Sequence, residues 1–274
     1  MSSMSKPQMA RATSGHLAWW EDRALRTASG VVVAFSERGG GCSGAPYASL
    51  NLAGHVGDAA DSVDANRSAF VEALGLAPLR DMLTMAEQVH GDAMAWVDAA
   101  TEGAGAWVER GPSAVARTDV LITERAKTPI ALCFADCVPV VLVAPRPAVA
   151  VVHAGWRGAL ASLPGRAARE LARRSGCEPA DITAYVGPHI GACHYEVSDE
   201  IMSQFVYTFG TFARAFSGGL DLEAVVSASL DRAGVAPCNI ARLGVCTAEA
   251  TDRFFSYRAE GGMTGRHAAL ACIL

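Results

Sequence analysis

The chain has 274 residues, a length that fits one large domain or two small ones. Hydrophobic residues make up 51% of it and charged residues 19%, so there is ample apolar material for a core. The net charge of −5 and the lack of a dense basic run argue against a surface for nucleic acid or for an anionic membrane. We therefore expect small-molecule partners.

Several features bear on where the protein works. The longest apolar stretch, residues 138–152, is interrupted by prolines and an arginine and is shorter than the roughly 20 residues of a membrane span. Residues 1–14 lack the apolar segment of a secretory signal. The eight cysteines occur in a long, core-rich chain, which favours reduced thiols over disulfides. These features predict a cytoplasmic protein, and the sequence leaves a monomer and a homodimer equally open.

The domain organisation is read from the same patterns. Residues 1–29 are expected to be an N-terminal arm that is poorly ordered in part, and residues 30–274 a single domain. The β-branched run at 30–35 predicts a strand, which leads into a glycine-rich loop at 36–42. The amides of such a loop can converge on an anion, with Arg38 beside them, although a plain flexible loop is an equally good interpretation.

The next part of the chain is rich in turns. Asn51 and His55 lie there, and His55 stands between glycines, where its side chain can face a cleft or the solvent. Ser62 then predicts the N-cap of a helix that ends near Leu74. Short strands are expected on both sides of His90, which a Gly-Asp turn signal places at a strand end or hairpin tip.

Two apolar runs at 130–134 and 148–153 are typical of buried strands. Cys137 follows the first run, and His153 ends the second. Pro139 should interrupt a ladder or lie at an edge, because proline cannot donate to a sheet. The segment after His153 continues from a strand into a helix, a common position for ligand-binding residues in α/β sheets.

The remaining elements alternate irregularly, which favours an α+β fold with mixed sheets. A short strand is expected at 118–123, and the carboxylate of Asp119 near its start either faces the site or caps a turn. A helix is predicted at 158–174, in which Pro164 marks a kink or the true first turn. Ser198 predicts the cap of another helix, with a core stripe of Phe205, Phe209, Phe212 and Phe216. The remaining predictions are a strand at 182–186, a helix at 221–233 and a closing strand at 268–274.

His90, Cys137 and His153 are candidate ligands of one metal ion. Imidazole and thiolate ligands suit zinc, and three protein ligands with an open fourth position are typical of a catalytic zinc site. Two other interpretations stay open from the residues alone: a buried cysteine with two turn histidines, and a hydrolase in which Cys137 is the nucleophile and a histidine the base. A multicopper site needs roughly ten histidines, many in His-x-His pairs, whereas this chain has seven and no such pair.

Seven segments, in this order, resemble the YfiH family of laccase-domain proteins, also called the purine nucleoside phosphorylase or peptidoglycan-editing factor family. They are Ser36-Glu37-Arg38-Gly39-Gly40, Ser49-Leu50-Asn51-Leu52 with His55-Val56-Gly57-Asp58, Gln88-Val89-His90-Gly91, Ala135-Asp136-Cys137, His153-Ala154-Gly155-Trp156-Arg157-Gly158, Gly187-Pro188 through Tyr195-Glu196-Val197, and Phe254-Phe255-Ser256-Tyr257-Arg258 with Thr264-Gly265-Arg266. Glu37 departs from the usual pattern and places an acid beside Arg38.

The resemblance implies a four-layer α/β/β/α sandwich with zinc on His90, Cys137 and His153. It also implies phosphorolysis of adenosine, inosine and 5′-methylthioadenosine, with deamination of adenosine. Two alternatives come with the family: hydrolytic editing of peptidoglycan precursors at the same Cys/His site, and copper-dependent polyphenol oxidation. Copper is therefore the second candidate metal, although the histidine count speaks against a laccase site.

The expected chemistry assigns roles to further residues. For deamination, zinc lowers the pKa of water to about 7, and Asp136 is either the general acid or a structural carboxylate that accepts backbone or histidine hydrogen bonds beside the ligands. For phosphorolysis, Arg38 and Arg157 are candidates for binding phosphate, since guanidinium groups bind it bidentately. Arg157 has the alternative role of a salt bridge that holds its loop. Asn51 and His55 are candidates for orienting ribose or phosphate.

Overall fold

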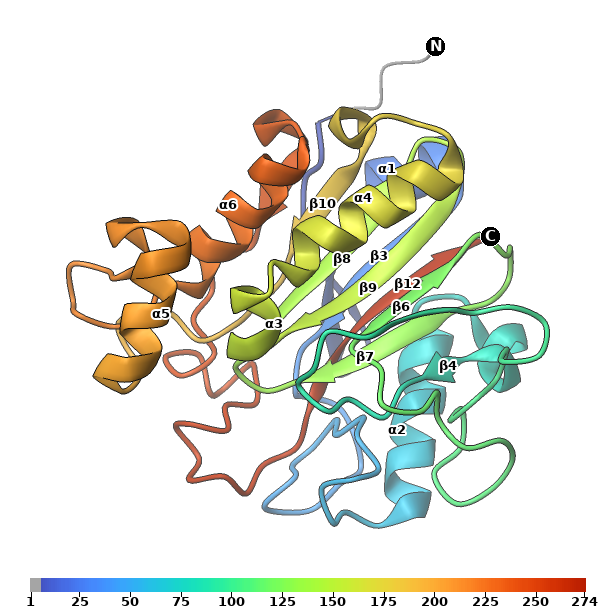
Figure 1. The fold of residues 1–274 in the computed structure, drawn as a ribbon. Helices are drawn as coiled ribbons and strands as arrows, with labels where there is room; N and C mark the ends of the chain where they lie inside the picture. Colours follow the sequence, from blue (N-terminus) through green and yellow to red (C-terminus); the bar gives the residue numbers. More distant parts are fainter. Residues whose placement is uncertain (1–5) are drawn as a thin grey trace.

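The computed structural model describes residues 6–274, which build two mixed six-stranded sheets packed face to face (Figure 1). The first sheet has the order β1 (Ala10–Ser14), β2 (Leu17–Glu21), β3 (Val31–Ser36), β12 (His267–Ile273), β7 (Ile130–Phe134), β4 (Thr84–Met85). The second has the order β11 (Ile240–Arg242), β10 (Thr183–Val186), β8 (Val138–Ala144), β9 (Ala148–Ala154), β6 (Val120–Thr123), β5 (Met94–Trp96). The pairs β4–β7, β5–β6 and β10–β11 are parallel and the other neighbours antiparallel, so the prediction of mixed sheets is confirmed.

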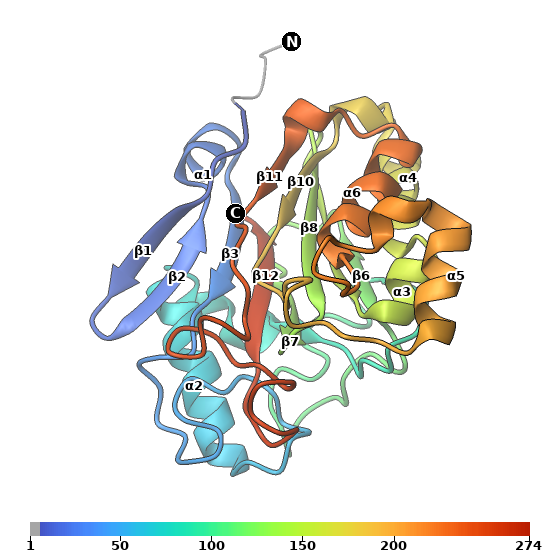
Figure 2. The same cartoon turned by 90° about the vertical axis from the view of Figure 1, so that its left-hand side faces the viewer.

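Helices cover the outer face of each sheet, which makes four layers (Figure 2). On the second sheet lie α3 (Trp156–Leu160), α4 (Leu163–Ser175), α5 (Asp199–Phe209) and α6 (Leu222–Ala233). The first sheet is covered by α2 (Ala60–Ala73), and α1 (Arg23–Ser29) packs beside β3. Short 3₁₀ turns lie at Ala77–Met82, Pro179–Asp181, Thr211–Ala213 and Pro237–Asn239. No helix in the described part of the chain combines the length and the apolar character needed to cross a bilayer.

The strands are apolar without interruption because both faces of each sheet are buried. In β3, Val31 and Val33 point into the core between the sheets, whereas Val32 and Ala34 point toward α2. Successive side chains of a strand point to opposite faces, so a run of valines serves two cores at once. This explains why the sequence shows continuous apolar runs here and no polar alternation.

The N-terminal segment is a part of the first sheet, which corrects the expectation of a loosely ordered arm for the residues that the structure describes. β1 and β2 form a hairpin, and β2 pairs with β3. The buried carboxylate of Glu37 accepts two hydrogen bonds from Arg11, at 2.8 Å each, and one from Trp20. Glu37 therefore anchors the hairpin, and residues 1–5 lie outside the described part of the chain.

Three helix predictions need correction. The predicted helix at 158–174 is two helices, because Ser162 has a left-handed backbone (φ 54°) and Pro164 lies in the first turn of α4. The helix predicted from Ser62 begins at Ala60 instead. α5 is capped by Ser198 as predicted but ends at Phe209, and the aromatic stripe is core only in part: Phe205 and Phe209 are buried, whereas Phe212 and Phe216 are exposed.

Candidate metal centre and its pocket

The three candidate ligands lie at one edge of the sandwich, where the chain passes between the sheets. His90 lies in the link from β4 to β5, and Cys137 in the link from β7 to β8. His153 is near the end of β9, and its position in the ladder is opposite Pro139 of β8. The ligand atoms of His90, Cys137 and His153 all lie within 4.8 Å of one another. The structure thus brings together three residues that are far apart in sequence.

Pro139 is accommodated because it lies at the end of the pairing between β8 and β10. Its carbonyl accepts a hydrogen bond from Gly187, just beyond β10, at 2.9 Å. The carbonyl of Gly187 in turn accepts a hydrogen bond from Nδ1 of His189 at 2.9 Å. The missing amide of Pro139 therefore leaves no gap in the ladder, and the adjacent turn can carry Cys137.

Asp119 is the residue that orients the ligands. Its fully buried carboxylate accepts a hydrogen bond from Nδ1 of His153 at 2.7 Å and from the backbone amides of Val89, His90 and Gly91 at 2.8–3.3 Å. The bond at Nδ1 leaves Nε2 of His153 for a metal ion, as in carboxylate–histidine–zinc arrangements. The amide bonds hold the turn in which His90 has a left-handed φ of 57°.

Gly155 leaves the space that the ligands occupy. A Cβ atom at this position would lie 3.0 Å from Cδ2 of His90 and 3.2 Å from Sγ of Cys137. Contacts this short would push the two side chains away from each other. The glycine after His153 is therefore a packing requirement of the cluster.

The electrostatics of the cluster favour a thiolate. Burial alone would raise the pKa of Cys137, but the charge and hydrogen bonds of His153 and His90 outweigh it and lower that pKa to about 6. Burial likewise opposes the charge on His153, whose pKa is nevertheless raised to about 9 by Cys137 and Asp119. A thiolate is the form of cysteine that binds a metal ion. Without a metal, His153 supplies the positive charge that a metal ion would bring.

The cluster opens into a pocket of about 480 Å³, a size typical of small-molecule sites. Positive and aromatic side chains dominate its wall. The residues that line it are His55, Gln88, His90, Cys133, Ala135, Asp136, Cys137, His153, Trp156, Arg157, Tyr195, Tyr257, Arg258 and Arg266.

Arg157 is the uncommitted cation of this pocket. It is exposed, and its guanidinium stacks on the ring of Trp156 at 4.3 Å. Within residues 6–274 its side chain stacks on Trp156 and takes part in no hydrogen bond to protein and in no ion pair. The alternative of a loop-holding salt bridge is therefore not supported, and the guanidinium is available to an anion.

Arg258 and Arg266 also line the pocket, although the sequence predicted no role for either of them. Arg258 donates to the carbonyl groups of His194 and Glu196 and stacks on Tyr195. Arg266 donates to the carbonyl groups of two neighbouring residues, and burial lowers its pKa. The only available signal was their place in segments that resemble the family, since neither stands beside a ligand in sequence.

The prediction that Arg38 binds phosphate is not supported by its contacts. Its guanidinium donates to the carbonyl groups of Ala48 and Thr251, forms an ion pair with Glu260 at 2.9 Å, and stacks on Phe255. Arg38 is not among the residues that line the pocket. Its donors are used to join segments of the chain, so its role is structural.

Asn51 does not reach the pocket either. The side chain is fully buried and bonds the backbone of Ala53, the carboxylate of Asp58 and the amide of Arg266. Asn51 therefore acts on the pocket through Arg266, whose backbone it holds. Direct contact with ribose or phosphate, as predicted, is not what its position provides.

Asp136 and His55 do line the pocket. The two carboxylate oxygens of Asp136 accept bonds of 2.7 Å from the hydroxyl of Thr247 and the amide of Arg258. These are the contacts of a carboxylate that orders neighbouring loops, the second of its two predicted roles. The pKa of His55 is lowered by partial burial and by Arg266, so this ring is neutral at pH 7.

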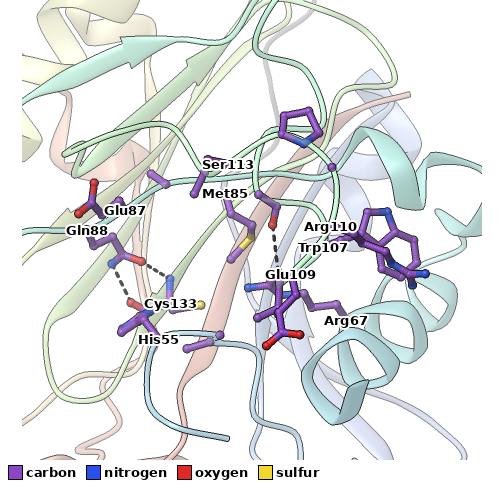
Figure 3. Close-up of a pocket in the computed structure, with 18 residues that line it drawn as sticks. His55, Arg67, Met85, Glu87, Gln88, Trp107, Glu109, Arg110, Ser113 and Cys133 are labelled. Carbon is purple, nitrogen blue, oxygen red and sulfur yellow. Dashed lines mark hydrogen bonds between the residues drawn. The ribbon is translucent and has the colours of Figure 1, made fainter. Parts of the chain in front are cut away.

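A second cavity of about 590 Å³ adjoins the pocket (Figure 3). His55, Gln88 and Cys133 line both spaces. Nε2 of Gln88 donates to the carbonyl of Cys133, and Oε1 of Gln88 accepts from the amide of Cys133, at 2.8 Å each. These two bonds fix the wall between the pocket and the second cavity. Trp107, at the far side of the cavity, lies between the guanidinium groups of Arg80 and Arg110.

Comparison with known proteins agrees with this architecture. The family described as multi-copper polyphenol oxidoreductase laccase matches residues 32–274. The chain belongs to this family. The laccase-domain family match covers both sheets except β1, β2 and the first residue of β3, and it includes every candidate metal ligand.

Relatives of this chain are named purine nucleoside phosphorylases, whereas the description of the family names a laccase. A protein of Geobacillus stearothermophilus named purine nucleoside phosphorylase YlmD is 37% identical over 246 residues, which cover 87% of this chain and 88% of that protein. A purine nucleoside phosphorylase of Streptomyces coelicolor is 38% identical and covers 88% and 94%. The crystal structure of a hypothetical protein YfiH of Bacillus licheniformis superposes with a TM-score of 0.87 at 30% identity and covers 96% and 99%.

The laccase-domain centre of this chain has a donor set that fits zinc. One thiolate and two imidazoles are zinc ligands, and the bond from Asp119 to His153 is the support that such ligands usually have. The cluster of His90, Cys137 and His153 offers only two histidines. A multicopper centre requires many more, so this cluster does not fit the multicopper site that the family's description names.

Proposed function

We propose that this protein is a zinc-dependent purine nucleoside phosphorylase that accepts adenosine, inosine and 5′-methylthioadenosine and also deaminates adenosine. The observation that carries the proposal is one pocket that holds both the three-ligand cluster and the free guanidinium of Arg157. The names of the relatives in Geobacillus and Streptomyces support the phosphorylase assignment. A cytoplasmic location fits a substrate class that is made and used inside cells.

Zinc would be held by His90, Cys137 and His153. When bound, it supplies a Lewis acid that lowers the pKa of water, the chemistry that deamination requires. The protein's contribution is to keep Cys137 as a thiolate and to present Nε2 of His153 through the bond to Asp119. All three ligands line the pocket, so a zinc ion held by them would be accessible to a substrate there, as in catalytic zinc sites.

Phosphorolysis makes different demands. A phosphate oxygen bonds to C1′ of the ribose while the bond from C1′ to the purine nitrogen breaks, and the departing base takes up a proton. Arg157 would bind the phosphate, because its guanidinium has free donors in a fork that matches phosphate oxygens. Tyr195 and Tyr257 present rings to the same pocket and offer surfaces on which a purine can stack.

The test is chromatography of products after incubation with adenosine, with and without phosphate. Phosphate-dependent release of adenine, lost in Cys137→Ala and kept in the exposed control Cys238→Ala, is the expected result. Formation of inosine without phosphate would reveal the deaminase activity. No turnover of any nucleoside by zinc-loaded protein would overturn the proposal, and muropeptides and phenols would then be the substrates to examine.

Arg157→Ala tests the phosphate site. We expect KM for phosphate to rise by about tenfold or more, since a charge-assisted bidentate bond is lost. The binding of nucleoside should change much less. Arg146→Ala, at an exposed turn, is the matched control. An unchanged KM for phosphate in Arg157→Ala would contradict the assignment.

A further inference from the structure

A second group of soft ligands lies outside the pocket. Cys193, His194, Cys246 and Glu249 direct their side chains toward one point, and the four ligand atoms all lie within 4.8 Å of one another. Nδ1 of His194 is 3.1 Å from Sγ of Cys193, 3.7 Å from Sγ of Cys246 and 3.6 Å from the carboxylate of Glu249. Sγ of Cys193 is 3.2 Å from the same carboxylate.

The fold holds these ligands in place. Cys193 and His194 lie in the loop after β10, and Cys246 and Glu249 lie in the turn after β11. β10 and β11 are parallel neighbours, so the two segments leave the sheet at the same edge. Reciprocal backbone bonds between His189 and the 245–247 segment then join the segments directly.

The immediate surroundings also fit a thiolate-bound ion. The amide of Gly191 donates to Sγ of Cys246 at 3.1 Å, which fixes the position of this sulfur atom. A Cβ atom at Gly191 would lie 3.2–3.3 Å from the sulfur atoms of Cys193 and Cys246, so the loop leaves little free space around both. Two thiolates and a carboxylate would bring three negative charges together, which a divalent cation neutralises in part.

The distances are close to those that a tetrahedral ion needs. With bonds of about 2.3 Å to sulfur and about 2.0–2.1 Å to nitrogen or oxygen, neighbouring ligand atoms of a zinc ion are about 3.3–3.8 Å apart. The measured separations of 3.1–3.7 Å require small shifts of side chains, three of which are exposed and free to adjust. A complete set of four protein ligands is typical of a structural site, whereas the pocket's cluster has three.

We propose that Cys193, His194, Cys246 and Glu249 form a second, closed site for a divalent cation of the zinc class. The ion ties the loop after β10 to the turn after β11. Both segments continue directly into the pocket: Tyr195 follows His194 and lines the pocket, and Thr247 follows Cys246 and donates to Asp136. The second site is thus a structural clamp on one wall of the pocket.

Zinc content in the presence of a thiol-free reductant tests the proposal. Cys137→Ser removes a ligand of the first cluster, and this variant is expected to keep one zinc ion per chain. Addition of Cys193→Ser should remove that ion, and addition of Cys238→Ser, an exposed cysteine outside both clusters, should leave it in place. The result does not depend on the proposed activity, because it counts ions and measures no turnover.

Two further measurements keep the test decisive if Cys137→Ser folds poorly. In the otherwise unchanged chain, Glu249→Gln alters an exposed side chain and should weaken binding of one zinc ion by about tenfold or more. Cobalt bound to Cys137→Ser should show the charge-transfer absorption of two cobalt–thiolate bonds. The proposal would be overturned if Cys137→Ser bound no zinc and Glu249→Gln left all zinc binding unchanged. It would also be overturned if Cys193 and Cys246 stayed joined by a disulfide after treatment with the reductant.

Discussion

Asp119 is the residue on which the geometry of the first cluster depends. One buried carboxylate fixes the ring of His153 and also the turn that carries His90, so two of the three ligands are set by the same group. The sequence indicated only that Asp119 could face the site or cap a turn. The structure shows both, because the amides of the turn and the imidazole converge on its two oxygens.

Asp119→Asn should weaken zinc binding by about 10–100-fold, the usual effect of losing a group that orients a metal ligand. The amide keeps one acceptor oxygen, but its NH₂ group faces donors that the carboxylate had satisfied. The measurement is competition for zinc with a chromophoric chelator. Asp92→Asn, an exposed acid paired with Arg166, is the control and should bind as the unaltered protein does. Equal affinities for both variants would contradict the role of Asp119.

His267 predicts a pH dependence of stability. The ring is fully buried between Phe134 and Phe254, and burial, aided by the charge of Arg266, lowers its pKa to about 3. The unfolded chain, with a pKa of about 6.5, takes up the proton first as the pH falls. The stability that neutral His267 contributes is therefore complete above about pH 6.5 and declines toward pH 3, by about 1.4 kcal/mol per pH unit.

Urea unfolding at pH 7.5 and at pH 5.5 measures this effect. Between these values the unaltered protein should lose about 1.4 kcal/mol more than His267→Phe, whatever the absolute stability of the variant. His16→Gln, at an exposed position, should keep the full loss. If His267→Phe showed the same loss, the titrating group would lie elsewhere.

At the scale of elements, the N-terminal hairpin depends on one buried acid. Glu37→Gln removes the charge that Arg11 and Trp20 bind, and should cost about 1–3 kcal/mol of unfolding free energy. The loss should be concentrated in β1 and β2, and hydrogen–deuterium exchange of residues 10–21 measures it. The exposed control Glu124→Gln should leave their protection unchanged. Protection of the hairpin in Glu37→Gln equal to that of the control would show that the acid does not anchor it.

The elements that sequence predicted well are those with local signals. Ser198 caps its helix as predicted, the helix predicted at 221–233 is α6, and the apolar runs of β3, β7 and β9 lie where expected. These signals involve residues within a few positions of one another. The failures at Phe212 and Phe216 are of a different kind, since the helical spacing continued beyond the point at which Gly210 ends the helix.

The candidate site was predictable only in part, for a related reason. Residue type alone left several interpretations of His90, Cys137 and His153 open among eight cysteines and seven histidines, and the resemblance to the family favoured one of them. The arginines do not stand out either: Arg38 bonds groups 213 and 222 positions away, and no local pattern distinguishes it from Arg157, which is free. The second cluster also joins residues more than 50 positions apart, and its Cys-His and Cys-x-x-Glu pairs are short, weak signals.

For the whole molecule, the first cluster joins the two sheets. His90 and Cys137 lie where the chain leaves the first sheet, and His153 belongs to the second. An unfolded chain does not hold these ligands together, so a zinc ion bound at this cluster would stabilise the folded state. At a free concentration 100 times the dissociation constant, the gain is about 2.7 kcal/mol.

This gain is measurable as a rise in melting temperature of about 5–10 °C over protein treated with a chelator. The comparison is best made in Cys193→Ser, so that only the first cluster contributes. Adding Cys137→Ser should then abolish the shift. If zinc did not change the melting temperature of Cys193→Ser, the ion would not hold the two sheets together.

The strand order has a consequence for how the molecule assembles. β12 follows every other strand in sequence, yet it lies between β3 and β7. Until residues 267–273 are in place, the first sheet is two separate halves with open edges, the kind of surface that pairs with other chains. Pairings between such distant segments form slowly, because a long loop must close first. Completion of the first sheet therefore cannot proceed from the N-terminus onward during synthesis, and a chain that stalls before β12 would expose edges for aggregation or for chaperones to cover.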